Sequence, residues 1–202
     1  GENWTTCELD KIYTADYYYV KFFDSDNGVI VCGYAKSNDT NESSRIYSTS
    51  NGGESWDIVG SGPATNIIKG VVYVSSDVGF FCYDYVEGMD SNLYKTDDGG
   101  KTFAKVMLEE QELDSSAANP QGQETETKTD SGKNGADSSE QLRWGDVYKE
   151  ALTPVVDSTG IITIYLTQGK NAVYNDGKTA AKYQSSDKGS TWKYIGQVEI
   201  KD

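Results

Sequence analysis

The chain has 202 residues, with 32 Asp and Glu against 18 Lys and Arg, and it contains no His. The net charge of −14 argues against binding to nucleic acid or to an anionic membrane surface, because both ligands are negatively charged. The absence of His excludes a Ser-His-Asp triad and a His-ligated zinc site. No apolar run approaches the length of about 18 residues that a bilayer requires, so the sequence predicts no transmembrane segment.

The composition is typical of an all-β protein. The chain has 15 Tyr and 21 Gly, and Tyr, Thr and Val favour strands whereas Gly, Asn, Asp and Ser supply turns. The cysteines are Cys7, Cys32 and Cys82. Cys32 and Cys82 each follow an apolar run, so we interpret them as small apolar residues inside strands rather than as a disulfide.

The chain divides into three similar units. Residues 1–16 resemble the last strand of a further unit, because Gly1 to Trp4 match the end of a motif described below. Each unit then reads as four antiparallel strands, A to D, joined by turn-rich segments. An acidic low-complexity segment separates the second unit from the third and has the composition of a solvated insertion. In chain order, the predicted units and the insertion are 17–62, 63–108, 109–145 (the insertion) and 146–202.

Each unit contains one motif, Tyr-x-[Ser/Thr]-x-[Asp/Asn]-x-Gly-x-[Ser/Thr]-[Trp/Phe]. We expect the Asx side chain to accept hydrogen bonds from its own turn and the glycine to permit a positive φ. The hydroxyl groups then tie the loop, and the final aromatic ring lies buried between neighbouring blades. The residues concerned are Thr49, Asn51, Gly53, Ser55 and Trp56; Thr96, Asp98, Gly100, Thr102 and Phe103; and Ser185, Asp187, Gly189, Thr191 and Trp192.

A calcium loop at Asp97, Asp98 and Gly99 is the competing interpretation of the second motif. The spacing of an EF-hand loop is missing there. The sequence therefore predicts no metal site and no cofactor.

The motif resembles the Asp-box, or bacterial neuraminidase repeat, of sialidases, sortilin-type receptors and propellers similar to photosystem II assembly factors. The resemblance implies a sialidase-like β-propeller built of four-stranded antiparallel blades, with at least three blades in this chain and each box between strands C and D. Propellers typically have four to eight blades. The remaining blades would come from a homo-oligomer or from the rest of a longer propeller, unless the blades form an open arrangement.

The arginine content argues against sialidase activity. Sialidases hold the carboxylate of sialic acid with three arginines, and this chain has only Arg45 and Arg143. Other glycoside hydrolases need two carboxylates at a suitable distance. A chain with 32 acidic residues contains such pairs by chance, so their presence is weak evidence for a hydrolase. We therefore expect a protein that is not an enzyme, the alternative being a fragment of a sialidase-like glycoside hydrolase with its remaining catalytic residues outside this chain.

The topology indicates where a ligand would bind. Alternating strand directions place the A–B turns and the boxes at one end of the sheets, and the B–C loops and D–A connections at the other. By the resemblance, the second end carries the functional site. Aromatic rings beside carboxylates suit sugar or peptide recognition, and the candidate residues in these loops are Tyr34, Asp39, Tyr85, Asp90, Trp144, Tyr148, Tyr174 and Asp176.

Together these features predict a non-catalytic binding or assembly module of the Asp-box type. Its partner would be a glycan or a protein, recognised through the B–C and D–A loop face. We expect a mature form located outside the cell or at the cell envelope. No signal peptide is visible at Gly1, and this absence does not decide the compartment, because a mature secreted protein lacks one too.

Overall fold

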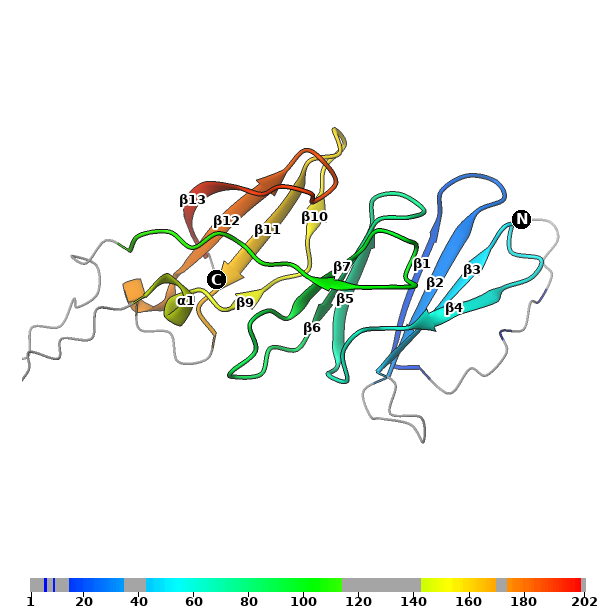
Figure 1. The fold of residues 1–202 in the computed structure, drawn as a ribbon, viewed down its shortest axis with the longest axis horizontal. Coiled ribbons are helices and arrows are strands. Elements are labelled where there is room, and N and C mark those ends of the chain that lie inside the picture. Colours follow the sequence, from blue (N-terminus) through cyan, green and yellow to red (C-terminus); the bar gives the residue numbers. More distant parts are fainter. Residues whose placement is uncertain are drawn as a thin grey trace, which may run out of the picture.

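The computed structural model describes residues 6, 9, 15–34, 43–113, 143–169 and 174–200. Within them it contains three antiparallel sheets that follow one another in chain order and lie side by side (Figure 1). The prediction of an all-β fold made of four-stranded antiparallel blades is therefore confirmed. Asp39, Cys7, the box-like segment 1–4 and residues 114–142 of the predicted insertion lie outside the described residues.

In the N-terminal and middle sheets the strands pair in sequence order. The strands of the N-terminal sheet are β1 (Tyr17–Phe22), β2 (Gly28–Gly33), β3 (Ser44–Thr49) and β4 (Asp57–Ser61). Those of the middle sheet are β5 (Ile68–Tyr73), β6 (Gly79–Tyr83), β7 (Leu93–Thr96) and β8 (Ala104–Lys105).

The C-terminal sheet differs in its first strand. The sequence predicts one strand over residues 151–156, but the structure has two short strands, because Pro154 between them has no N–H to donate to the ladder. Both pieces pair with β11. The sheet contains β9 (Glu150–Ala151), β10 (Val155–Val156), β11 (Ile162–Thr167), β12 (Thr179–Ser185) and β13 (Lys193–Glu199).

Helix is confined to two short pieces of the described chain, α1 (Trp144–Val147) and the 3-10 turn η2 (Tyr174–Gly177). None of the described helices has the length and apolarity needed to cross a membrane.

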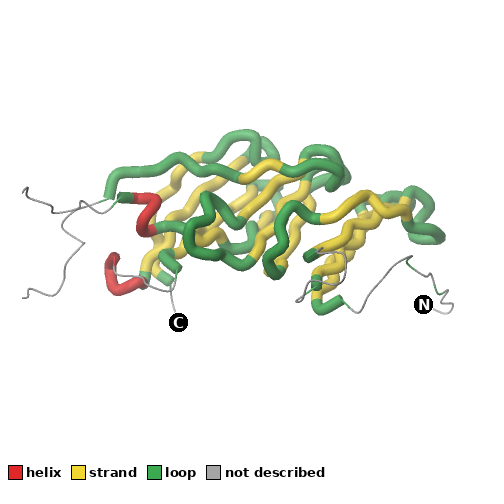
Figure 2. The backbone as a smooth tube through the Cα atoms, turned by 60° about the horizontal axis from the view of Figure 1, so that its bottom comes forward, coloured by secondary structure: helices red, strands yellow, loops and turns green. Residues whose placement is uncertain are grey.

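The sheets pack on one another through both faces of the middle sheet (Figure 2). Successive side chains of a strand point to opposite faces. Val71 and Tyr73 of β5 therefore join a core shared with the N-terminal sheet, whereas Val72 packs against the core shared with the C-terminal sheet. Both apolar faces of the middle sheet are thus removed from water.

Tyrosine hydroxyl groups join the first two sheets as well. The Tyr17 hydroxyl accepts the backbone N–H of Val71 at 3.1 Å, and the Tyr19 hydroxyl accepts that of Tyr73 at 3.0 Å. The edge strand β5 therefore receives polar partners from the neighbouring sheet.

The second and third boxes form the same hydrogen-bonded loop. One carboxylate oxygen of Asp98 accepts the N–H of Thr102 at 2.8 Å, and the other accepts the Thr102 hydroxyl at 2.6 Å. Asp187 makes the corresponding bonds with Thr191, at 2.9 and 2.6 Å. These bonds favour the charged form, so the pKa values of both carboxyl groups lie well below the ordinary range.

The first box has an amide in place of the carboxylate, and one hydrogen bond reverses. Asn51 still accepts the N–H of Ser55 at 3.0 Å through its carbonyl oxygen. Its amide nitrogen, however, donates to the Ser55 hydroxyl at 2.9 Å, where in the other boxes the hydroxyl donates to a carboxylate. A hydrogen bond to a charged acceptor is stronger than one between neutral groups, so the first box is the weaker version of the loop.

The box aromatic residues occupy equivalent places with different neighbours. Phe103 meets Phe81 at a centroid distance of 4.9 Å beside the core shared with the N-terminal sheet, and Trp192 of the third box contacts Phe80 of the middle sheet at 6.0 Å. Trp56 contacts Phe22 at 5.8 Å on the face of the N-terminal sheet that points away from the middle sheet. Two of the three rings therefore lie beside a core shared between sheets.

Replacing Asn51 with Asp should raise the melting temperature at neutral pH, because Ser55 then donates to a carboxylate as Thr102 does. The pKa of the new carboxyl group is lower in the folded protein than in the unfolded chain. The gain in stability is therefore complete above the unfolded-state pKa of about 4, and it disappears as the pH falls through the folded-state pKa. Thermal unfolding of both proteins from neutral to acidic pH measures this difference. A lower melting temperature of Asn51→Asp than of the parent protein at pH 7 would contradict this prediction. Asn51→Ala is the control, because it removes the side-chain hydrogen bonds of the loop.

Candidate functional site

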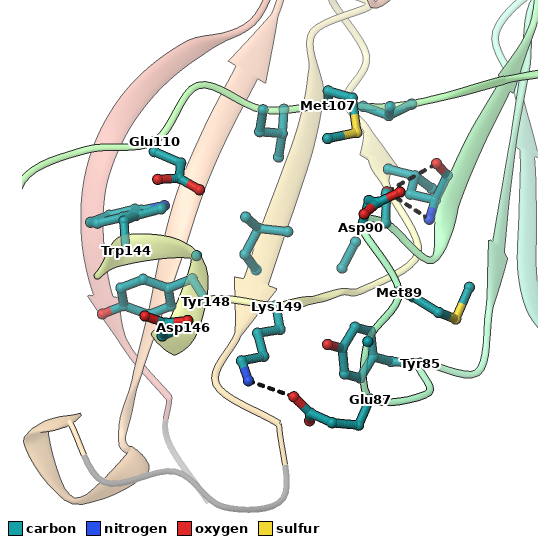
Figure 3. Close-up of a pocket in the computed structure, with 18 residues that line it drawn as sticks. Tyr85, Glu87, Met89, Asp90, Met107, Glu110, Trp144, Asp146, Tyr148 and Lys149 are labelled. Carbon is teal, nitrogen blue, oxygen red and sulfur yellow. Dashed lines mark hydrogen bonds and ion pairs between the residues drawn. The ribbon is translucent and has the colours of Figure 1, made fainter. Parts of the chain in front are cut away.

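A cleft of about 280 Å³ opens at the end of the sheets opposite the boxes. It lies between the loop that joins β6 to β7 and the segment around α1, with the segment that follows β8 on a third side (Figure 3). These are the B–C loop of the middle sheet and the D–A connection to the C-terminal sheet. The cleft is lined by Tyr85, Glu87, Gly88, Met89, Asp90, Ser91, Leu93, Val106, Met107, Leu108, Glu110, Trp144, Gly145, Asp146, Tyr148, Lys149, Ala151 and Leu166.

Two buried aromatic rings form one wall of the cleft. Trp144 and Tyr148 lie with ring centroids 4.6 Å apart, and they are only 4% and 3% exposed. The Tyr148 hydroxyl bonds to that of Thr179 at 2.8 Å, and burial raises the pKa of Tyr148. Trp144 and Val147 are the two buried residues of α1 and are three positions apart, so one helical turn suffices to anchor this wall.

A single asparagine joins the two sheets beneath the cleft. The side-chain oxygen of Asn92 accepts the N–H of Ala151 at 2.9 Å, and its amide nitrogen donates to the carbonyl of the same residue at 2.9 Å. The amide also donates to the Tyr83 carbonyl at 2.8 Å. Asn92 therefore provides the hydrogen-bond partners that a neighbouring strand would give to the backbone of β9. It also fixes the position of the lining residue Ala151.

The rim of the cleft is charged. Lys149 forms an ion pair with Glu87 at 2.7 Å across the opening (Figure 3), and Lys105 pairs with Asp90 at 2.7 Å. The hydrogen bond and charge of Lys105 hold the pKa of Asp90 below its usual value, and Glu87 raises that of Lys149. The pairs fasten the loop before β7 to its neighbours.

Two further carboxylates, Glu110 and Asp146, belong to the lining and lie on either side of the aromatic wall (Figure 3). Both residues are exposed. The carboxylate of Glu110 lies over Gly145, where an added Cβ would come within 2.5 Å of its oxygen. A side chain at position 145 would therefore displace Glu110.

The structure brings together half of the residues proposed for ligand binding. Tyr85, Asp90, Trp144 and Tyr148 all line the cleft. Tyr174 packs behind Tyr148 at a centroid distance of 6.2 Å and is buried.

The other candidates lie elsewhere. Tyr34 belongs to a buried cluster of the N-terminal sheet, and Asp176 is exposed on η2 outside the cleft. Of the two arginines, Arg45 is buried in β3 and Arg143 is exposed just before α1.

No protein-family model matches this chain, and no curated protein matches it. Among solved structures, the chain is similar to a GH74 enzyme from Niastella koreensis, with a TM-score of 0.41 and 16% sequence identity. The match covers 83% of this chain and 19% of the other, so the chain spans about a fifth of the length of that enzyme. The fold assignment above rests on the pairing of this chain's own strands.

Sequence reasoning missed several lining residues, among them Glu87, Glu110, Asp146 and Lys149. It also missed that Met89 and Met107, the two methionines of the chain, both lie in the cleft. A signal was available for Glu110 and Asp146, because Glu110 lies at the start of the predicted insertion and Asp146 directly follows it, so both belong to the longest D–A connection. No sequence pattern distinguished these carboxylates from the other acidic residues.

Replacing Asn92 with Ala should destabilise the protein by about 2–4 kcal/mol, since the buried N–H of Ala151 loses its acceptor and the Ala151 carbonyl is left to the weaker Cys82 thiol donor. Urea unfolding followed by tryptophan fluorescence measures the loss. Ser91→Ala is the neighbouring control, because its buried hydroxyl bonds to Leu93 of the same sheet among the described residues, so its loss should cost less than the loss of a side chain that joins two sheets. Equal stability of Asn92→Ala and the parent would show that the joint between the sheets is not held by this side chain.

Proposed function

We propose that the chain is a non-catalytic binding module of the Asp-box propeller type and that it takes a glycan in the cleft between the middle and C-terminal sheets. The observation that carries the proposal is the convergence of loop-face residues on this cleft. Four residues proposed for their chemistry line it together, two from the loop between β6 and β7 and two from the segment around α1. A concave site with a few converging polar groups is the usual form of a small-ligand site.

The lining suits a sugar on two counts. The Tyr85 ring and the Met107 side chain offer apolar surface to the C–H face of a pyranose ring. The carboxylates of Glu110 and Asp146 accept hydrogen bonds from hydroxyl groups. The buried Trp144 and Tyr148 hold the site in place and do not stack on the ligand.

A glycan array screened with the full chain, followed by calorimetric titration of the best ligand, tests the proposal. Replacing Tyr85 with Ala should weaken binding about tenfold, which corresponds to loss of one aromatic contact. Tyr18→Ala is the matched control, since Tyr18 is an exposed tyrosine on the N-terminal sheet. Failure of every glycan to bind, or equal affinity of the two variants, would overturn the proposal.

The ionic-strength dependence of binding separates a glycan from a basic protein segment. A neutral sugar held by hydrogen bonds should bind equally well in low and high salt, whereas a cationic segment on this acidic rim would lose affinity as salt screens the charges. Glu110→Gln should change the salt dependence only in the second case. A steep salt dependence lost in this variant would assign the cleft to a protein ligand.

A glycoside hydrolase fragment is the second candidate, favoured by the presence of Glu110 and Asp146 in one cleft. The pair formed by Asp90 and Lys105 points the other way, because it lowers the pKa of Asp90 and a catalytic acid needs a raised one. We expect the full chain to release no aglycone from chromogenic glycosides. Turnover that disappears in both Glu110→Gln and Asp146→Asn would make the chain an enzyme.

A further inference from the structure

The charged side chains around the cleft do not balance one another. Among the described residues that line it, four carry a carboxylate and a single one, Lys149, carries a positive charge. The four are Glu87, Asp90, Glu110 and Asp146. The cleft therefore has an excess of negative charge at its opening.

The lysines near the opening are already paired. Lys149 lies 2.7 Å from the Glu87 carboxylate, and Lys105, which stands outside the lining, lies 2.7 Å from that of Asp90. The hydrogen bond from Glu87 is the main cause of the raised pKa of Lys149, and the charge of Asp146 adds to it. An anionic ligand would therefore have to compete with carboxylates of the protein for these two ammonium groups.

Glu110 and Asp146 are the carboxylates that no cation holds. Neither forms an ion pair or a side-chain hydrogen bond with another residue in the described part of the chain. Both are exposed, and Figure 3 shows them on either side of the wall formed by Trp144 and Tyr148. A sugar that enters beside this wall therefore meets two negative charges whose side chains are free to accept hydrogen bonds.

The described lining also lacks a guanidinium group, the usual partner of a ligand carboxylate or sulfate. Arg45 is buried in β3 of the N-terminal sheet. Arg143 is exposed just before α1 and does not line the cleft. The net charge of −14 adds a long-range field of the same sign, which disfavours the approach of an anion.

We propose that the cleft selects sugar units without negative charge and rejects those that carry a carboxylate or a sulfate group, with Glu110 and Asp146 as the specificity-determining residues. This inference rests on the proposed function. Like charges at short range raise the free energy of the wrong complex and leave that of the right one unchanged. Neutral hydroxyl groups can donate hydrogen bonds to the same two carboxylates, so these side chains favour an uncharged sugar while they repel an acidic one.

An array that prints neutral glycans beside their acidic counterparts, such as lactose beside sialyllactose and galactose beside its sulfate ester, tests the inference with the full chain. In the pairs that bind, the neutral member should bind at least about tenfold more tightly, since each of two carboxylates at about 6 Å from an anion contributes roughly threefold even in water. High salt should narrow the difference, because it screens the repulsion. Acidic glycans that bind as tightly as neutral ones, or more tightly, overturn the inference and leave the proposed function standing, whereas failure of every glycan to bind overturns both.

Variants that remove one charge assign the discrimination to the cleft. Glu110→Gln and Asp146→Asn should each lower the ratio of neutral to acidic affinity about threefold, and the double variant should bring the ratio close to one. Asp77→Asn is the matched control, because it removes the same charge from an exposed turn whose backbone bonds to Gly99 of the second box, at the other end of the sheets. An equal fall of the ratio in Asp77→Asn, or a double variant that keeps the parent ratio, overturns the assignment to these two carboxylates. The ratio is the decisive readout, since a purely structural effect would weaken both members of a pair alike.

Discussion

A sheet that is apolar on both faces is stable only when both faces are covered, and this requirement governs the whole chain. Strand β6 shows it most clearly, since all five of its residues are buried although alternate side chains point to opposite sides. The middle sheet meets the requirement through its two neighbours. The middle place of this sheet therefore follows from burial, whereas the outer face of the N-terminal sheet is covered in part by Leu9.

The cleft arises where the chain passes from the middle sheet to the C-terminal one. The last strand of the middle sheet, β8, is only two residues long, and the first strand of the next sheet is broken at Pro154. Backbone groups that a longer strand would satisfy are instead met by Asn92. The connection is thus free to carry side chains that face the opening, and α1 anchors it through two buried residues.

Much of the fold was readable from the sequence because it repeats. The three boxes set the spacing of the units, and turn residues separate strands of alternating pattern, so the strand order within each unit follows from the sequence. The break at Pro154 was missed because the apolar pattern continues across it. The Asx hydrogen bonds were foreseeable, since the acceptor and its turn lie within a few residues of each other.

Only half of the ligand-binding residues predicted from the sequence line the cleft, and the reason is physical. Tyr85 and Trp144 were predicted because aromatic rings beside carboxylates in these loops suit sugar or peptide recognition, and that signal is local. The positions of Glu110 and Asp146 depend on how residues 106–113 cross the C-terminal sheet, which is a long-range contact that no local pattern encodes. The repeated part of the chain forms the boxes at one end of the sheets, and the unrepeated connections form the cleft at the other. The boxes therefore indicate the architecture and carry no information on a ligand, because a ligand is recognised by the chemistry of particular residues and not by the fold.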